Sequence, residues 1–223
     1  MIRHALAMLS LLALAAPAAA QSMKTDDGAP VQAAGFGSVV TINGDQVLVA
    51  EPNDIRAPGA VYVYGKQGGD WAQLHRLTAE SPARGDLFGA SIATSGNRMI
   101  VGSTLQGGGQ GAAFVFEKAG DGWRQVAHLS ASDAAAGDSL GTSVAIDGSV
   151  ALVGAGGADS GRGAVYVFRA DGSGSWSQAA RIAAPEGTVP DDRYADVLGL
   201  SGGSAIVSAT RADSGQGAVY LYR

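Results

Sequence analysis

The sequence repeats itself with a period of 52 to 54 residues from Phe36 to its end. The clearest marker is a Gly-Ala segment that continues into small apolar and aromatic residues. Two further series recur in phase with it: a large apolar residue followed by Gly or Ala, and a single Trp in each complete unit. The three series begin at Gly59, Gly111, Gly163 and Gly217, at Phe36, Phe88, Leu140 and Tyr194, and at Trp71, Trp123 and Trp176. Because unrelated residues would not keep one phase by chance, the period indicates one structural unit repeated four times.

Each unit predicts four β-strands, here named a to d in chain order. Strand a follows the first marker, as in residues 38–42, and ends in a tight turn such as Asn43-Gly44, a strong hairpin signal. Strand b is an apolar run such as 47–49, and strand c is the Gly-Ala series. Strand d starts at the Trp and alternates apolar with polar residues, as an outer, partly solvated strand does. Glycine density leaves no helical apolar stripe, so we expect no helices.

Strands b and c are apolar at consecutive positions, so both faces of each sheet must be covered. Antiparallel four-stranded sheets covered by copies of themselves are the blades of a β-propeller. We therefore predict an all-β propeller of four blades of about 52 residues. Its last blade lacks the outer strand. A row of stacked sheets with exposed apolar end faces is the alternative. The predicted repeats are 36–87, 88–139, 140–193 and 194–223.

These markers resemble FG-GAP repeats, which occur in the propeller of integrin α-chains and in bacterial exported proteins. Phe36-Gly37 and Phe88-Gly89 match the first half of that motif, and residues 140–168 follow the bacterial wording most closely. The resemblance covers residues 36–223 and departs most at Tyr194-Ala195. It implies a propeller and, by analogy with integrins, a ligand on the face that carries the b–c loops.

The first twenty residues are typical of a secretory signal. A short basic start leads into an apolar Leu/Ala run, a Pro, and three alanines before Gln21. The run is shorter than the ~20 residues of a membrane span, and no later segment predicts one. We expect export to the bacterial periplasm or the extracellular space, with residues 21–35 as an N-terminal segment before the propeller.

Composition narrows the possible chemistry. A net charge of −5 argues against nucleic-acid binding, and the absence of Cys removes disulfides and thiolate sites. The resemblance would suggest calcium in the a–b loops, but these are two-residue turns with too few oxygen ligands. We expect no cofactor. Asp191, Asp192 and Asp196 are a weak alternative candidate for a calcium site.

Acidic residues also recur before the first marker, at Asp86, Asp138 and Asp192. They indicate either a ring of carboxylates or, as we favour, caps that accept backbone N–H bonds. The histidines of the repeats, His75 and His128, fall one position apart in the alignment and suggest no catalytic pair. We therefore predict no catalytic residue and leave enzymatic activity as the less favoured reading.

Binding is expected on the b–c loops, because loops that vary on a repeated scaffold commonly carry function. The candidate ligand-binding residues are Glu51, Asn53, Asp54, Arg56, Asp159, Arg162, Arg211 and Asp213. The sequence thus predicts a non-enzymatic exported binding or adhesion scaffold whose partner is a protein or a glycan. Two alternatives remain: a propeller that binds or degrades polysaccharide, and a structural subunit whose open fourth blade joins a second chain to complete a larger ring.

Overall fold

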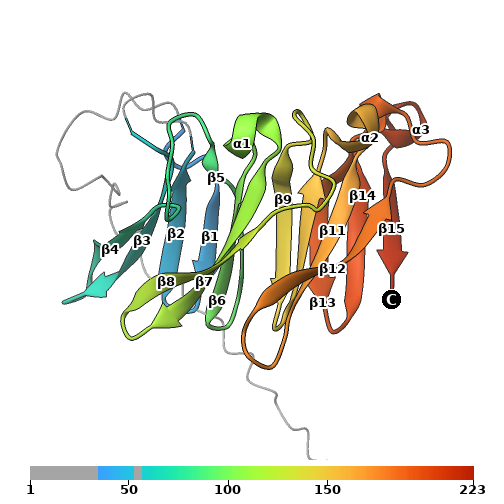
Figure 1. The fold of residues 1–223 in the computed structure, drawn as a ribbon. Coiled ribbons are helices and arrows are strands. Elements are labelled where there is room, and N and C mark those ends of the chain that lie inside the picture. Colours follow the sequence, from blue (N-terminus) through green and yellow to red (C-terminus); the bar gives the residue numbers. More distant parts are fainter. Residues whose placement is uncertain (1–34, 53–56) are drawn as a thin grey trace, which may run out of the picture.

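Four antiparallel β-sheets stand side by side in chain order in the computed structural model (Figure 1). The structure describes residues 35–52 and 57–223. Each sheet is one blade, and the chain runs through its strands in order from one edge to the other. The all-β architecture of propeller blades is therefore as the repeat predicted. Among the described residues, no helix is long and apolar enough to cross a membrane.

Blades 1 and 2 are complete sheets of four strands, which correspond to strands a to d. Blade 1 contains β1 (Val40–Asn43), β2 (Gln46–Glu51), β3 (Ala60–Gln67) and β4 (Asp70–Leu77). Blade 2 contains β5 (Phe88–Ser95), β6 (Arg98–Ser103), β7 (Ala112–Ala119) and β8 (Gly122–Leu129).

Blade 3 is also complete, whereas blade 4 has three strands. Blade 3 contains β9 (Leu140–Asp147), β10 (Val150–Ala155), β11 (Ala164–Ala170) and β12 (Trp176–Ala183). Blade 4 contains β13 (Tyr194–Ser201), β14 (Ser204–Ala209) and β15 (Ala218–Tyr222). The missing outer strand confirms the prediction, and it leaves β15 as an edge strand within the described part of the chain.

The hydrophobic core of the described residues contains three layers, one between each pair of neighbouring blades, and a fourth cluster on the outer side of blade 1. The side of a blade that turns to the following blade is called its front face, and the opposite side its back face. Small aliphatic side chains of the front face, such as Val61 and Val63 of blade 1, pack against Phe114 and Phe116 on the back face of blade 2. Equivalent layers join blades 2 and 3 and blades 3 and 4. Alternation along each strand thus gives every inner blade two buried faces.

The glycine that opens strand c allows this close stacking. A Cβ atom on Gly111 would lie 2.2 Å from the carbonyl oxygen of Leu140 in the next blade, and one on Gly163 would lie 2.3 Å from that of Tyr194. Since any side chain would collide with that backbone, the Gly-Ala series is a packing requirement of the blade interface.

The front face of blade 4 is exposed, and the described blades form an open arc rather than a closed ring (Figure 1). On the front face of blade 4, four apolar side chains are 47–69% exposed, whereas the matching side chains Leu152 and Val165 of blade 3 are at most 2% exposed. On the back face of blade 1, Val40 and Ile42 of the outermost strand β1 are 56% and 69% exposed, whereas Val49, Tyr62 and Tyr64 are buried. The exposed residues of blade 4 are Val197, Ile206, Val219 and Leu221. The exposed apolar face of blade 4 is one feature that the sequence analysis attached to a row of sheets, but blade 1 does not expose an equivalent face.

The loops between strands b and c contain short helical turns in blades 2, 3 and 4. They are α1 (Gln106–Gly109), α2 (Ala158–Gly161) and α3 (Ala212–Gly215), and a single 3-10 turn, η1 (Pro190–Asp192), precedes blade 4. Each α turn contains two residues with left-handed φ angles, such as Asp159 at 53° and Ser160 at 61°. The expectation of no helices was therefore wrong for these single turns, although none continues into a regular helix.

Candidate binding face

One end of the arc carries α1, α2, α3 and η1, and we call this surface the loop face (Figure 1). In blades 2, 3 and 4 a backbone bond holds the b–c loop against the segment before strand a. The carbonyl oxygens of Asp86, Asp138 and Asp192 accept the backbone N–H of Leu105, Gly157 and Arg211 at 3.0–3.1 Å. The loops are thus fixed by the scaffold at the same point in three successive blades.

The recurring aspartates support the turn into strand a. The carboxylate of Asp138 accepts the N–H of Ala135 at 2.8 Å, and that of Asp192 accepts the N–H of Val189 at 2.9 Å. Capping of this kind is the interpretation that the sequence analysis preferred over a ring of free carboxylates.

A basic side chain of strand d fastens the b–c loop of each complete blade. It lies five residues after the Trp, across from the first aromatic residue of strand c. Arg76 donates to the carbonyl oxygen of Pro58, His128 bonds Gln106 at 3.2 Å, and Arg181 binds Asp159 at 2.8 Å. We call this basic residue the loop latch.

The blade 3 latch has the densest set of contacts. Arg181 binds Asp159 of α2 and Asp133 at 2.8 and 3.1 Å, and its Nε donates to the hydroxyl of Tyr166 at 3.1 Å. The bonds to Asp159 and Tyr166 raise the pKa of Arg181, and burial raises the pKa of Tyr166. Asp159, one of the predicted ligand residues, is therefore engaged in holding its own loop.

The candidates in blade 1 divide into one buried residue and three without a described position. Glu51 is buried, and its carboxylate accepts a 2.7 Å bond from the hydroxyl of Tyr62. Burial is the main cause that raises the pKa of Tyr62. Glu51 therefore belongs to the fold of blade 1 and not to an exposed ligand surface. Asn53, Asp54 and Arg56 lie outside the described residues, as do residues 1–34 with the predicted signal segment.

Three exposed arginines gather around η1. Arg162 follows α2, whose Gly161 approaches Pro190 of η1, and Arg193 directly follows η1. Arg211 donates its backbone N–H to Asp192. No hydrogen bond or ion pair to a described residue is found for the three guanidinium groups. Two of the predicted candidates, Arg162 and Arg211, thus lie on segments that adjoin η1. Arg193, which the sequence analysis did not predict, lies there as well.

A hollow of about 310 Å³ opens beside this group, between blades 3 and 4. Its wall combines hydroxyl groups and Arg193 with a larger share of apolar surface, and the Asp196 carboxylate accepts a 2.7 Å bond from Thr210. The lining residues are Ser139, Thr142, Gly156, Gly157, Pro190, Arg193, Tyr194 and Asp196. Sequence reasoning missed Arg193 and the hydroxyls because no repeat marker includes them. The insertion between Ile182 and Tyr194, which lengthens this unit, was the available signal.

The acidic candidates for a metal site do not assemble into one. Asp192 caps its turn and Asp196 binds Thr210. In the described part of the chain, no three carboxylate or imidazole groups lie close enough together to hold a metal ion. Asp213, on α3, has an exposed carboxylate for which no bond is found among the described residues.

Blades 1 and 2 enclose a second hollow, at the other end of the strands. It has a volume of about 440 Å³, and Lys66, His75 and Lys118 contribute to a mostly polar wall. Lys66 and Lys118 lie over the rings of Trp71 and Trp123, and His75 bonds the carbonyl oxygen of Asp121. The two lysine contacts are explained by packing of strand c against strand d within a blade, whereas the His75 bond joins blade 1 to blade 2.

The comparison with protein families identifies the repeat. The model of the FG-GAP repeat matches residues 71–116 and 123–168. No curated protein matches the chain. Each matched segment begins at the Trp of one blade and ends in strand c of the next, so it includes the interface between two blades.

Proposed function

We propose that this chain, which contains FG-GAP repeats, is an exported, non-enzymatic scaffold that binds an anionic partner through its loop face. FG-GAP repeats suggest an interaction scaffold of the propeller type. Export is supported by the signal-like first twenty residues. The observation that carries the proposal is the group of three exposed arginines beside an open hollow.

The chemistry of this group favours a carboxylate-bearing partner. Guanidinium groups bind planar carboxylates through paired hydrogen bonds. Arg162, Arg193 and Arg211 are exposed in a chain whose net charge is −5, and nearby Asp159, Asp192 and Asp196 already have partners within the fold. Those engaged carboxylates favour binding over acid–base hydrolysis of a polysaccharide. The carboxylate could come from an acidic protein segment or from a uronate polysaccharide.

A binding screen with two arms tests the proposal. The full chain is titrated with a Glu-rich peptide library and, separately, with polygalacturonate. We expect one of the two arms to give saturable, salt-sensitive binding, which the double variant Arg162→Gln and Arg193→Gln reduces about tenfold. The arm that binds identifies the source of the carboxylate.

The control variant removes the same charge elsewhere. Arg84→Gln with Arg124→Gln changes two exposed arginines away from η1 and should leave the affinity unchanged. Equal loss in both double variants would reduce the effect to net charge and refute the site. Failure of both arms would refute the function.

A further inference from the structure

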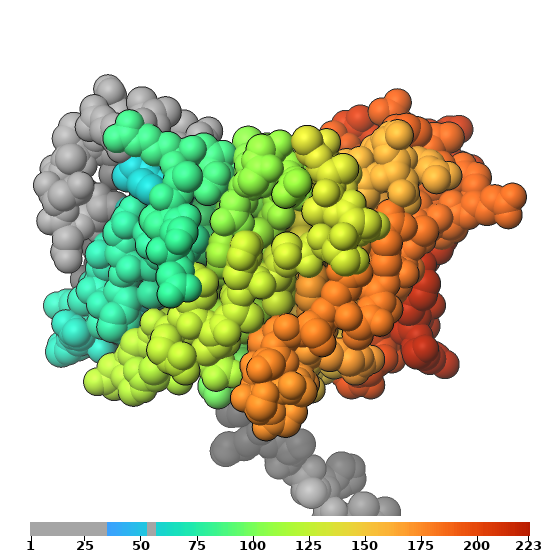
Figure 2. Space-filling view, viewed as in Figure 1, coloured from blue at the N-terminus to red at the C-terminus, as the bar shows by residue number. Residues whose placement is uncertain are grey.

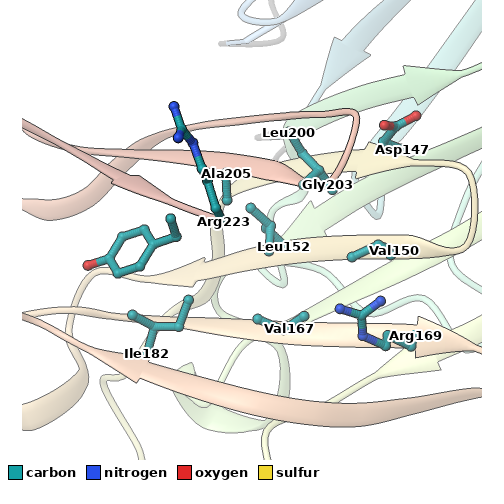
Figure 3. A pocket seen from close by; sticks show the side chains of 11 residues that line it. Asp147, Val150, Leu152, Val167, Arg169, Ile182, Leu200, Gly203, Ala205 and Arg223 are labelled. Carbon is teal, nitrogen blue, oxygen red and sulfur yellow. The ribbon is translucent and has the colours of Figure 1, made fainter.

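A cavity of about 180 Å³ lies between blades 3 and 4 (Figure 3). It is next to the a–b turns, at the end of the strands opposite to η1. Blade 3 contributes Val150, Leu152 and Val167, which appear on one side in the close-up, and blade 4 contributes Leu200 and Ala205. Asp147, Arg169 and Arg223 add polar groups. An apolar cavity of about 150 Å³ is large enough to bind benzene, so this one is large enough for an aromatic ring.

The equivalent position at the two inner interfaces is filled by a Trp of strand d. Trp123 of blade 2 reaches back to blade 1, where its indole N–H donates to Gln46 at 3.2 Å. Trp176 of blade 3 reaches back to blade 2, where Arg98 lies over its ring at 5.7 Å. Gln46, Arg98 and Val150 occupy the same place in the repeat, and Val150 lines the cavity. The cavity is thus where the outer strand of blade 4 would place its aromatic residue.

Among the described residues, no strand pairs with the edge beside this cavity. Strand c of blades 1, 2 and 3 pairs on both sides, whereas β15 pairs with β14 alone among the described residues. An edge with free backbone N–H and C=O groups accepts an added strand.

A second candidate contact, the carboxylate of Asp213, lies at the other end of β15. Turns α2 and α3 have the same sequence, Ala-Asp-Ser-Gly, and nearly the same backbone, with φ angles of 53° at both Asp159 and Asp213. Asp159 receives the loop latch Arg181, which crosses the ring of Tyr166 at 5.6 Å. In blade 4 the matching pair is Asp213 and Tyr220, and no described residue supplies the latch. The exposed carboxylate is therefore complementary to a basic side chain.

We infer that β15 and this cavity bind an extended segment of a partner protein that carries a Trp followed five residues later by a basic residue. The spacing is that of Trp71 to Arg76, Trp123 to His128 and Trp176 to Arg181 in the chain's own outer strands. The Trp enters the cavity, the segment pairs antiparallel with β15, and the basic residue crosses Tyr220 to reach Asp213. This site is separate from the arginines of the proposed function and does not depend on it.

The test uses the protein's own outer strand as the probe. A labelled synthetic peptide with the sequence of residues 174–184, which contains Trp176 and Arg181, is titrated into the full chain by fluorescence anisotropy. We expect saturable binding, about tenfold weaker when the Trp of the peptide is replaced by Ala. Replacement of its Arg by Ala should weaken binding up to about fivefold, as for a partly exposed ion pair.

Variants of the protein locate the peptide. Asp213→Asn should cause the same loss as the Arg-less peptide and no further loss when combined with it, whereas Asp45→Asn, at an exposed turn of blade 1, should have no effect. Ala205→Ile fills the cavity and should abolish the advantage of the Trp. Because Ala205 is buried and this variant can fail to fold, the Asp213 cycle is an independent criterion.

Three results would overturn the inference. They are absence of saturable binding at millimolar peptide, equal affinity of the peptide without Trp, and a dimer in light scattering that excess peptide does not dissociate. The last would identify a second copy of the chain as the occupant of the edge.

Discussion

Blades 3 and 4 share a similar pattern of small, apolar and aromatic residues, yet the exposure of their front faces differs sharply. Val165 of blade 3 is fully buried by blade 4, whereas Val219 at the same position of blade 4 is 69% exposed. Figure 2 displays the blades in order across the surface, and the red end belongs to blade 4. The apolar pattern of a strand therefore shows which face can pack against another blade. Whether that face is buried depends on the presence of the neighbouring blade.

The largest difference between blades 3 and 4 is expected when the glycine that opens strand c is replaced in each. Gly163 and Gly217 both have left-handed φ angles, 90° and 81°, but only Gly163 faces the backbone of another blade. We expect Gly163→Ala to lower the free energy of unfolding by about 3 kcal/mol through strain and collision with Tyr194, and Gly217→Ala by about 1 kcal/mol through strain alone.

Urea denaturation of both variants measures this difference. Similar losses would mean that the interface between blades 3 and 4 yields easily, contrary to the close approach of Gly163 to Tyr194.

Trimming the front faces should give a smaller effect in the same direction. Val165→Ala removes two methyl groups from a closed layer and should cost about 2 kcal/mol. Val219→Ala removes them from a solvated face and should change the stability by less than about 0.5 kcal/mol. Thermal unfolding of the two variants provides the measurement. A clear loss from Val219→Ala would indicate that this end face is covered in solution, for example in an oligomer.

The smallest expected effect compares the loop latches. Blades 1 and 3 use arginines, whereas blade 2 uses His128, which stacks on Phe114 at 4.9 Å and whose pKa burial lowers. A lowered folded-state pKa favours neutral His128, so its contribution is complete above the ordinary pKa of about 6.5 and is lost as the pH falls below it.

We therefore expect the free energy of unfolding of the wild type, relative to His128→Arg, to decrease by about 0.3 kcal/mol between pH 7.5 and pH 5, a small value because the side chain is only partly covered. Paired denaturation curves at the two pH values provide the check. No difference in pH dependence between the two proteins would remove the role assigned to this imidazole.

Much of the fold could be predicted from the sequence because the repeat places equivalent residues in equivalent environments. The turn at Asn43-Gly44, the strands around it and the three-stranded last blade all follow from spacing and alternation. The single turns α1 to α3 could not, because left-handed φ angles at Asp159 and Ser160 are unusual for residues other than glycine. The opening of the arc could not either, since residue patterns do not fix the angle between blades.

The candidate residues were harder to predict than the fold. The sequence predicts that polar loop residues are available for ligands, but Glu51 and Asp159 bind Tyr62 and Arg181 within their own blades. Loop sequence alone does not reveal such partners, because they come from strands c and d. The constant interval of five residues between Trp176 and Arg181, repeated in the other units, was the signal that could have identified the latch.

The matched FG-GAP segments and the blades are out of step, because residues 71–116 contain the last strand of blade 1 and the first three strands of blade 2. Duplication of such a segment within a gene would not produce a free-standing sheet beside the old ones. It would supply the outer strand of the preceding sheet, and its own sheet would take its outer strand from the following segment. Each added unit would thus share a sheet with both of its neighbours. Arcs of this kind can therefore change their length by whole units while every internal junction stays covalently bridged.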